Sequence, residues 1–427
     1  MPALLAAPPA SQHRLHLTNA RIFDGSGAAI REGAAVLVED GRIARVDSSS
    51  GATPAERSRT IDLAGRTLMP GLIDVHQHVS GRTPRPRDGA EPVLEGTAHH
   101  FLQASLREFL RFGVTTVRDV GSQGRQPQEA RQAMRYGAFR GPRLLTCGKI
   151  ISATAPGGRF YGDMYREADG ADDVRKAVRE QVRAGADFIK VMTTGARSNE
   201  LEDPEPTQFT DAEFAALVDE AHRLGFKVAA HAEGLLGIEA AVRHRMDTVE
   251  HGMYLNQRPS LLDAMAQNDQ VLVPTLTGYY WMAGLGDAIE VDAAESEPRL
   301  TPMLVQLAHH NLAEGAKTLR SAKAAGVKIA LGSDGELEAR NVSLELLRMI
   351  HHGLTSEEGL VAATKTAAEA LGLSDYIGTV EPGKLADLVV VDGDPLAEPQ
   401  LLHDPARIWL VLQLGEPVAG AGLPLLG

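Results

Sequence analysis

The sequence predicts an α/β fold in which a (β/α)8 barrel of the TIM type is inserted into a small β-sandwich formed by the N- and C-terminal segments. In the middle of the chain, apolar strand-like runs alternate with helical stretches eight times, which is typical of parallel strands that close into a barrel. At both ends, short strands follow one another with turns between them. The 427 residues are enough for a barrel of about 250 residues and a smaller module.

We expect four consecutive parts. Residues 1–12 form a flexible tail rather than a signal peptide, because they have no basic segment and contain a Pro-Pro step. Residues 13–69 form the first part of the β-sandwich, where the Asp40-Gly41 step between two apolar runs predicts a hairpin. Residues 70–376 form the barrel, and residues 377–427 complete the sandwich.

Apolar runs and helical periodicity place the elements of the barrel. The eight strands are expected at 72–78, 114–120, 143–147, 188–194, 227–233, 248–253, 271–276 and 328–334. Helices are expected between most of them, at 104–112, 172–184, 211–224 and 312–325, and a longer helical region follows at 343–371.

Composition excludes several classes of protein. The net charge of -13 argues against a general nucleic-acid binder, because phosphate contacts need clustered Lys and Arg. No run reaches the roughly 18 consecutive apolar residues of a membrane span. The single cysteine, Cys147, can form neither a disulfide framework nor a thiolate zinc site and is expected to be buried. We therefore expect an acidic cytoplasmic protein without nucleic-acid or membrane partners.

Active sites of such barrels lie at the carboxyl ends of the strands, so polar residues there are the candidates. His76 and His78 end the first strand with one residue between them, and alternation along a strand points both side chains the same way. The other candidates are Lys190, His231, His251 and Asp334, at the ends of strands four, five, six and eight. Each alone is explained as a structural residue, but six groups converging on one end of one barrel predict a metal site.

The donor set suggests which chemistry this site performs. Zinc accepts imidazole and carboxylate ligands together, and four histidines with one aspartate are more than a single ion with an open position needs. Two ions require a bridging anion. Burial lowers the pKa of a lysine, and a neutral amine reacts with carbon dioxide to give a carbamate that behaves as a carboxylate. A carboxylated, metal-bridging Lys190 explains a lysine among the apolar residues of strand four.

Motifs along nearly the whole chain resemble the amidohydrolase superfamily: PGLIDVHQH, GVTTVRDVG, FIKVM, VAAHAEG, TVEHGMYL, ALGSDGE and GTVEPGKLADLVVVDGDPL. Within it, the chain is most similar to the branch of imidazolonepropionase-like proteins and metal-dependent Xaa-Pro and Xaa-Arg/Lys dipeptidases. The loops after strands three, five and eight differ from frequent patterns of the dipeptidase-like relatives. Because these loops shape the pocket, the resemblance says more about the metal ligands than about the substrate.

The resemblance assigns roles to the six groups. His76, His78 and Asp334 would hold a buried ion, His231 and His251 a more exposed one, and carboxylated Lys190 would bridge them together with a hydroxide. Asp334 would take a proton from that hydroxide and pass it to the leaving amine, so Asp334 and Lys190 are the expected catalytic residues. The resemblance also implies two Zn²⁺ per chain, with Mn²⁺ or Co²⁺ as substitutes, and a homo-oligomer.

The expected function is therefore a binuclear zinc hydrolase that cleaves an amide C–N bond of a small molecule, a dipeptide or N-acyl amino acid. A cyclic amide, a carbamate or an aromatic xenobiotic amide, such as a mycotoxin or pesticide amide, is the alternative substrate of the same centre. A metal-binding scaffold without catalysis is the non-enzymatic alternative. It is disfavoured because all six ligand types are present.

Loop residues give weaker candidates for substrate binding. They are Tyr254, Arg197, Arg159 and Tyr161, in loops expected at the carboxyl end of the barrel. Arg197 would either hold a substrate carboxylate or be an exposed loop arginine. The Tyr279-Tyr280-Trp281 run is expected either to line the pocket or to pack on the barrel rim. The adjacent pairs His99-His100, His309-His310 and His351-His352 are expected to be surface or interface residues, because neighbours on a helix do not share a face.

Overall fold

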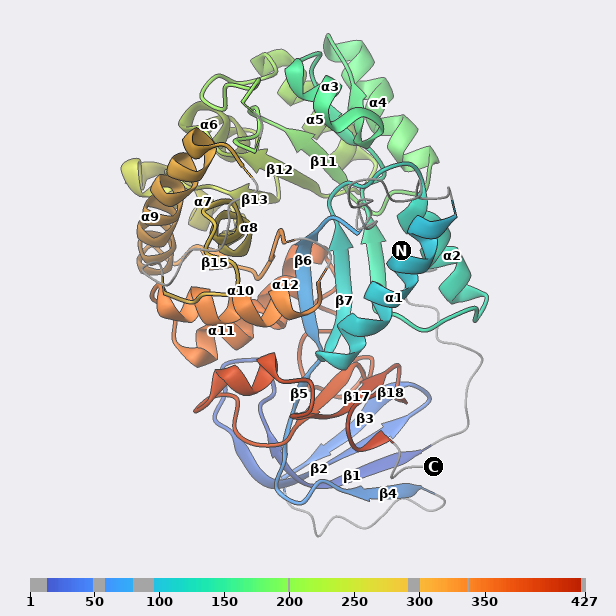
Figure 1. Cartoon of the computed structure of the whole chain (residues 1–427). Helices are drawn as coiled ribbons and strands as arrows, with labels where there is room; N and C mark the ends of the chain where they lie inside the picture. The colour runs from blue at the N-terminus through green and yellow to red at the C-terminus, as the bar shows by residue number, and fades with distance from the viewer. Residues whose placement is uncertain are drawn as a thin grey trace, which may run out of the picture.

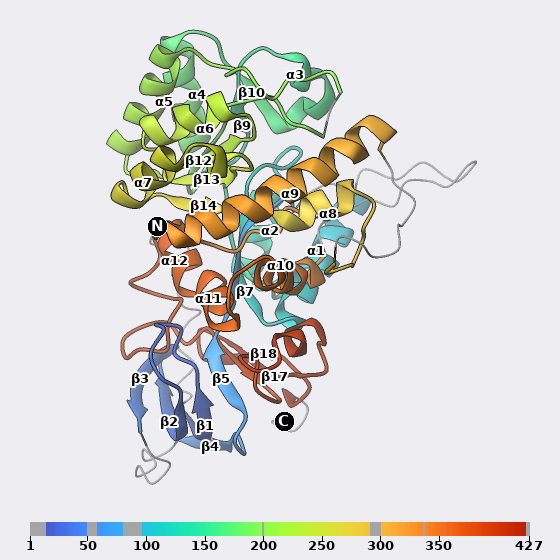
Figure 2. The same cartoon turned by 90° about the vertical axis from the view of Figure 1, so that its left-hand side faces the viewer.

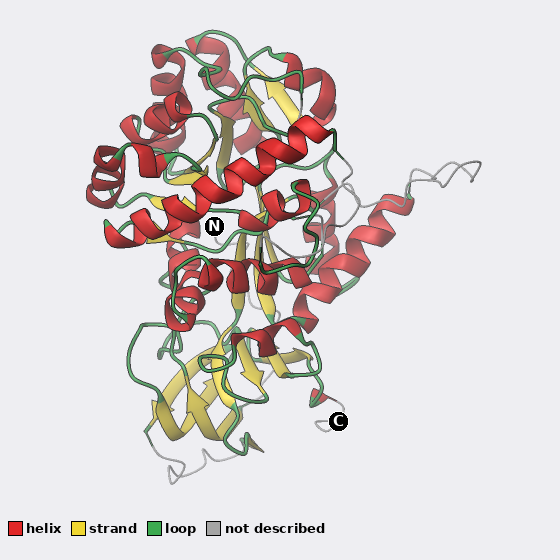
Figure 3. Ribbon diagram, turned by 60° about the vertical axis from the view of Figure 1, so that its left-hand side comes forward, coloured by secondary structure: helices red, strands yellow, loops and turns green. Residues whose placement is uncertain are grey.

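The computed structural model describes residues 14–48, 58–79, 96–198, 200–290, 300–335 and 338–423. The expected N-terminal tail, residues 1–12, lies outside these ranges. In the described part, a barrel wrapped in helices stands on a module made mostly of strands (Figures 1 and 3). No helix among the described residues is both long enough and apolar enough to cross a bilayer.

The predicted barrel is confirmed, and its eight strands lie where the sequence predicts them. They are β6 (Leu72–Gln77), β7 (Val114–Asp119), β8 (Arg143–Thr146), β11 (Ile189–Met192), β12 (Val228–Ala232), β13 (Thr248–His251), β14 (Val271–Val273) and β15 (Lys328–Ile329). Their mutual ladders are parallel. Closure comes from the backbone N–H of Val75, which donates to Leu331 O at 3.0 Å.

The third strand of the barrel is divided, which the sequence did not predict. β8 pairs with β7, whereas the following segment β9 (Ile150–Ser152) pairs with β11. A further short strand, β10 (Tyr165–Glu167), adds to β9. Every residue of β6, β7 and β11 to β13 is buried, because side chains fill the barrel on one side and helices cover it on the other.

Helices cover the outside of the barrel (Figure 2). The helices of the described residues are α1 (Thr97–Arg111), α2 (Gln126–Arg135), α3 (Pro156–Tyr161), α4 (Ala171–Arg183), α5 (Asp211–Arg223), α6 (Leu235–Arg243), α7 (Pro259–Gln267), α8 (Leu276–Met282), α9 (Pro302–Ala324), α10 (Arg340–His351), α11 (Ser356–Ala362) and α12 (Lys365–Leu371), with 3-10 turns η1 (Gly162–Met164), η2 (Leu255–Gln257) and η3 (Pro399–His403). α5 begins at a capping box of Thr210 and Glu213. The single helical region expected at 343–371 is three helices, α10 to α12.

Strands from both ends of the chain form one hydrogen-bonded sheet. Its members are β1 (Leu15–Ile22), β2 (Arg31–Glu39), β3 (Arg42–Asp47), β4 (Arg59–Asp62), β5 (Thr67–Pro70), β16 (Leu388–Val391), β17 (Ile408–Gln413) and β18 (Glu416–Ala419). The antiparallel β5–β16 ladder, with Met69 opposite Val389, joins the two ends. The hairpin predicted at Asp40-Gly41 is present between β2 and β3, with φ of 49° and 76° at its two turn residues.

The module touches the end of the barrel where strands begin. Arg143, the first residue of β8, forms a buried ion pair with Asp387, which precedes β16, at 2.5 Å. The backbone N–H of Gly71, directly before β6, donates to Asp387 O at 2.8 Å. The carboxyl ends of the barrel strands therefore lie on the side away from the module.

Candidate metal centre

The two histidines of the first strand meet the aspartate of the eighth. Nε2 of His76 and Nε2 of His78 each lie 3.4 Å from Oδ1 of Asp334, so the two imidazoles share a direction as strand alternation predicts. The backbone N–H of Asp334 donates to His76 O at 2.9 Å, which joins the two segments directly. Three of the six predicted ligand side chains thus converge on one point.

The histidines of strands five and six complete the cluster. Nε2 of His251 lies 2.9 Å from Nδ1 of His231, and the rings of His76 and His251 are 5.2 Å apart between centroids. Donor atoms of His76, His251 and Asp334 all lie within 4.8 Å of one another. All six predicted ligands, Lys190 included, line a single cavity of about 320 Å³ at the carboxyl end of the barrel.

Two of these groups reach the cluster through unusual backbone. His251 has φ of 69° and Asp334 has φ of 45°, in the left-handed region that side chains other than glycine rarely adopt. Simple alternation along β13 places His251 on the face opposite its neighbour Glu250. Both side chains nevertheless contact groups of the site. Backbone strain of this kind is concentrated at functional sites.

Lys190 is the best indicator of what the cluster binds. It is buried in β11, and its Nζ has no hydrogen-bond partner among the described residues. Burial lowers the pKa of Lys190, although the carboxylates of Glu250 and Asp334 oppose this effect. A buried amine without a partner, beside four imidazoles and a carboxylate, fits the donor set of a divalent metal centre with a modified lysine.

Sequence reasoning missed a buried carboxylate that orients His76. Oε2 of Glu250 lies 2.7 Å from Nδ1 of His76, and its Oε1 accepts from Nη2 of Arg118 at 2.8 Å. Both charged side chains are almost completely buried. The sequence signal that could have indicated this contact is a glutamate and an arginine on two interior strands, because buried charges are normally paired.

Asp74 joins the first strand of the barrel, β6, to the segment that follows the last strand, β15, where the barrel closes. Its carboxylate accepts from the backbone N–H of His76 at 3.0 Å and from that of Ser333 at 3.1 Å. Burial raises the pKa of Asp74 to about 6, against the hydrogen bonds that lower it. This bracing was not predicted, and it fixes the segment that carries His76 against the segment that carries Asp334.

The predicted substrate-binding residues lie in different surroundings. Tyr161 lines the cavity, and its OH lies 2.5 Å from Oγ of Ser198. Arg197 and Tyr254 are not among the lining residues: Nη2 of Arg197 donates to Glu205 at 2.6 Å, and Tyr254 OH donates to Asn311 at 2.8 Å. Arg159 is exposed on α3.

The aromatic run after strand seven takes both of its expected roles. Tyr279 and Trp281 line the cavity, and Tyr279 OH donates to the carboxylate of Glu233. Tyr280 is buried behind them, with the guanidinium of Arg348 4.1 Å from its ring centroid. The surface expectation for His352 is wrong: it is buried, and its Nε2 lies 2.8 Å from Tyr280 OH. Cys147 is buried as expected.

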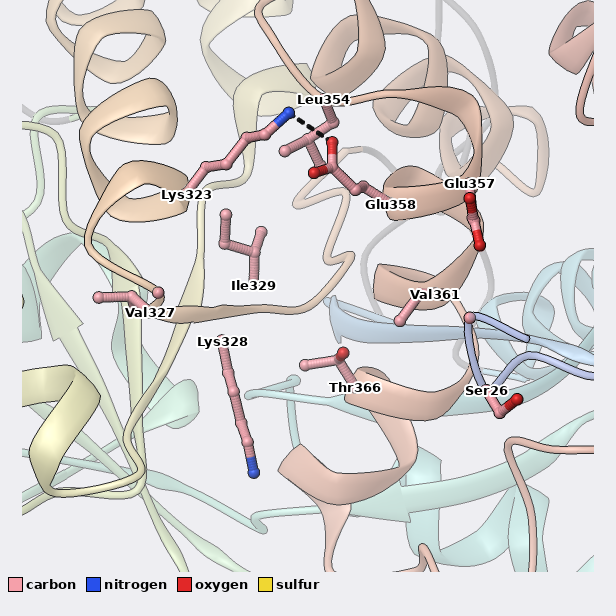
Figure 4. A pocket seen from close by; sticks show the side chains of 12 residues that line it. Ser26, Lys323, Val327, Lys328, Ile329, Leu354, Glu357, Glu358, Val361 and Thr366 are labelled. Carbon is pink, nitrogen blue, oxygen red and sulfur yellow. Dashed lines mark hydrogen bonds and ion pairs between the residues drawn. The ribbon is translucent and has the colours of Figure 1, made fainter. Parts of the chain in front are cut away.

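A second cavity, of about 350 Å³, lies at the opposite end of the barrel (Figure 4). It is lined by Val327, Lys328 and Ile329, where β15 begins, and by residues of α11. Its lysines are already paired: Nζ of Lys323 lies 2.6 Å from Glu358, and Nζ of Lys328 lies 2.8 Å from Asp269. Because barrel enzymes place their chemistry at the carboxyl ends of the strands, the metal-ligand cavity is the candidate active site.

Comparison with known proteins agrees with this geometry. A family model described as the amidohydrolase family matches residues 67–418. An ochratoxinase from Aspergillus niger is 29% identical over 435 residues, which cover 94% of this chain and 86% of the relative. An imidazolonepropionase from Pseudomonas putida is 26% identical over 415 residues, covering 88% of this chain and 91% of the relative.

A solved structure shares the whole architecture. A Xaa-Pro dipeptidase with methionine bound in its active site superposes with a TM-score of 0.82 at 25% identity, and the match covers 95% of this chain and 99% of the dipeptidase. The coverage includes the barrel and the terminal module. The resemblance that the motifs indicate is therefore confirmed by sequence and by fold.

Proposed function

This chain belongs to the amidohydrolase family and is a hydrolase of amide-type C–N bonds, and from that premise we propose a binuclear zinc enzyme that cleaves the amide of a dipeptide or an N-acyl amino acid. The observation that carries the proposal is the convergence of six donor groups on one cavity. Among them is the amine of Lys190, which has no hydrogen-bond partner in the described part of the chain. A metal-binding scaffold would not require that arrangement beside an open cavity.

The proposed ligand set follows from position. His76, His78 and Asp334 would hold one ion, His231 and His251 the second, and a carbamate on Lys190 would serve both; Mn²⁺ or Co²⁺ would suit the same donors. When bound, such ions lower the pKa of water and polarise a carbonyl group. We place the protein in the cytoplasm as a homo-oligomer that acts on a small molecule.

The residues of the chain have distinct tasks in this proposal. Asp334 accepts the proton of the attacking water and donates it to the leaving amine, because its carboxylate lies beside the histidine donors and faces the cavity. Glu250 holds the imidazole of His76 in one orientation through its 2.7 Å contact with Nδ1. The cavity walls orient the substrate and exclude water from the reacting bond.

The first test is metal content. Purified protein should contain about two divalent ions per chain, and chelation should abolish hydrolysis that added Zn²⁺ restores. Lys190→Ala should lose metal, and a small carboxylate such as acetate should restore part of it by replacing the carbamate. Full activity of a folded, metal-free protein would refute the proposal, and normal metal content in Lys190→Ala would refute the bridge.

A second candidate substrate is a cyclic amide, a carbamate or an aromatic xenobiotic amide, cleaved by the same centre. It is favoured by the similarity to an ochratoxinase over 94% of this chain. A screen of N-acyl amino acids and dipeptides against aryl amides and carbamates separates the two candidates. The class with the higher kcat/KM identifies the substrate.

A further inference from the structure

Beside the metal ligands, the same cavity has a wall of aromatic and sulfur-containing side chains. They include Tyr161, Met164, Tyr165, Met192, Trp281 and Met282. They come from separate parts of the chain: α3 and η1 with the strand that follows them, the end of β11, and α8. In a chain with only 4% aromatic residues, their gathering in one cavity is a feature of that cavity and not of composition.

The first side of this wall is a pair of stacked tyrosines. The rings of Tyr161 and Tyr165 are 4.9 Å apart between centroids and inclined by 27°. The ring of Phe160 packs edge-on against Tyr161 at 4.8 Å. The contact of Tyr161 OH with Ser198 Oγ at 2.5 Å fixes the ring in its plane. This side therefore presents an ordered aromatic surface before any ligand arrives.

The second side of the wall is helix α8, which is anchored by contacts with neighbouring segments outside the cavity. The backbone N–H groups of Leu276 and Thr277 donate to the carboxylate of Glu345 at 2.9 and 2.7 Å. The guanidinium of Arg340 lies 5.9 Å from the ring centroid of Trp281. In Figure 2, α8 lies alongside α9, which supports it from outside. Trp281 is thus carried on a braced element.

We propose that this cavity binds a planar aromatic group that the substrate carries next to its scissile C–N bond, against the Tyr161–Tyr165 stack and Trp281. The inference rests on the proposed function, because it places the scissile bond at the metal ligands. A flat π-system stacks on tyrosine and tryptophan rings, and methionine sulfur makes favourable contacts at its edge. A saturated ring of the same size gains the burial but not these ring contacts. A cavity of about 320 Å³ also has room for such a group beside an amide.

The proposal is tested with matched amides. Benzoyl and cyclohexanecarbonyl derivatives of one amine place the ring on the acyl side, and an anilide and a cyclohexylamide of one acid place it on the amine side. In at least one pair, the zinc-loaded enzyme should hydrolyse the aromatic member with a kcat/KM at least tenfold higher. Equal or reversed preference in both pairs would overturn the aromatic site while leaving the amide hydrolase intact.

A variant locates the effect at the proposed wall. Trp281→Leu should raise KM for the preferred aromatic amide about tenfold with little change for its cyclohexyl counterpart, and Trp281→Phe should restore most of the difference. Trp409, the other tryptophan, lies in the terminal module against Arg66, so Trp409→Leu is the matched control. A Trp281→Leu variant that weakens both members equally would contradict a specific ring contact.

Binding without hydrolysis separates this inference from the proposed function. In Trp409→Phe, Trp281 is the only tryptophan, so its fluorescence reports on the cavity wall. Acetophenone and cyclohexyl methyl ketone carry a carbonyl group but no C–N bond. Acetophenone should change the emission saturably at a concentration at least tenfold lower than its cyclohexyl counterpart. A saturable signal in a protein that cleaves no amide would uphold the site and refute the function; no saturable signal would refute the site.

Discussion

At the scale of single residues, Asp334 is placed to move a proton. Its Oδ1 lies 3.4 Å from both His76 and His78, and the imidazoles hold the pKa of Asp334 low although burial opposes this. We expect Asp334→Asn to keep the fold, because the amide has nearly the same shape, and to lower kcat by about 10²- to 10⁴-fold or more, because general acid–base catalysis is lost. Steady-state kinetics on metal-loaded protein measures this.

The control for that prediction is an aspartate of the outer surface. Asp219 is paired with Arg175 at 2.6 Å and is largely exposed, so Asp219→Asn should leave kcat unchanged. Metal content must be measured for both variants, because Asp334 is also a proposed ligand. A fully loaded Asp334→Asn enzyme with near wild-type turnover would rule out the proton-transfer role.

Glu250 acts through His76. It joins the imidazole of His76 to the guanidinium of Arg118 in a buried chain. Glu250→Gln should reduce metal affinity or kcat about 10- to 100-fold, the usual effect of losing a carboxylate behind a metal-bound histidine. The affinity is measured by competition with a chelator, which reports on the site without turnover.

An exposed pair of the same kind provides the comparison. Nε2 of His99 lies 2.7 Å from Glu129, and both side chains are about half exposed. Glu129→Gln should change neither metal affinity nor kcat. If Glu250→Gln behaves like Glu129→Gln, the buried contact does not position His76.

At the scale of elements, a carboxylate on helix α10 anchors the first turn of helix α8. Glu345 on α10 accepts from two backbone N–H groups at the start of α8, and burial raises its pKa to about 7 despite these bonds and the nearby Arg348. A folded-state pKa above the unfolded value of about 4.3 means that ionisation favours the unfolded chain as pH rises. Wild-type stability should therefore fall between about pH 4.5 and 7 through this group.

The variant Glu345→Gln removes that titration. As pH rises from 5 to 8, the Tm of the wild type should fall relative to the Tm of Glu345→Gln, because only the wild type loses stability through ionisation of the carboxyl group at position 345. Thermal unfolding followed by circular dichroism at several pH values measures it. Tyr280, which stacks on Arg348, does not contribute to this difference, because burial and Glu345 raise its pKa to about 12 and it ionises only at alkaline pH. A pH-independent difference would show that Glu345 does not titrate in this range.

Periodicity predicted the elements of the barrel because each strand is short, buried and separated from the next by a helix. It did not predict the division of the third strand into β8 and β9, because that break depends on which neighbour each half pairs with. The direction of the His251 side chain was not predictable from the sequence either. Its left-handed φ of 69° departs from the strand alternation on which the prediction relied, and only the surrounding packing holds such a conformation.

Contacts between distant segments explain what the sequence left open in the site. Five of the six proposed ligands were recognisable because they lie at or just beyond the carboxyl end of a predicted strand, and Lys190 because it is a lysine among the apolar residues of strand four. Glu250 was not, because it lies one residue inside β13 and its partners come from β6 and β7. The surroundings of Arg197 depend on Glu205 and Tyr254, which no local pattern connects to it. Long-range pairing of this kind is decided by the fold.

At the scale of the whole molecule, the terminal module and the barrel share a buried ion pair. Arg143 begins the third barrel strand, Asp387 precedes β16, and both side chains are at most 4% exposed. Asp387 also accepts from the backbone N–H of Leu414 at 2.8 Å, while Gln413 donates to Gly141 O at 3.2 Å across the same boundary. The module is therefore bound to the barrel in part through a buried ion pair and partly buried hydrogen bonds.

Breaking this pair should destabilise the entire chain without touching the chemistry. Asp387→Asn removes the carboxylate that pairs with the buried guanidinium of Arg143, and breaking a buried pair in this way should cost about 3–5 kcal/mol. Glu108→Gln removes an exposed ion pair with Arg111 and should cost less than about 1 kcal/mol. Urea unfolding followed by circular dichroism gives both values. Because the pair lies at the opposite end of the barrel from the metal ligands, kcat per folded, metal-loaded molecule should stay unchanged in both variants. A stable Asp387→Asn protein with altered kcat would mean that the module acts on the site and not on the barrel's stability.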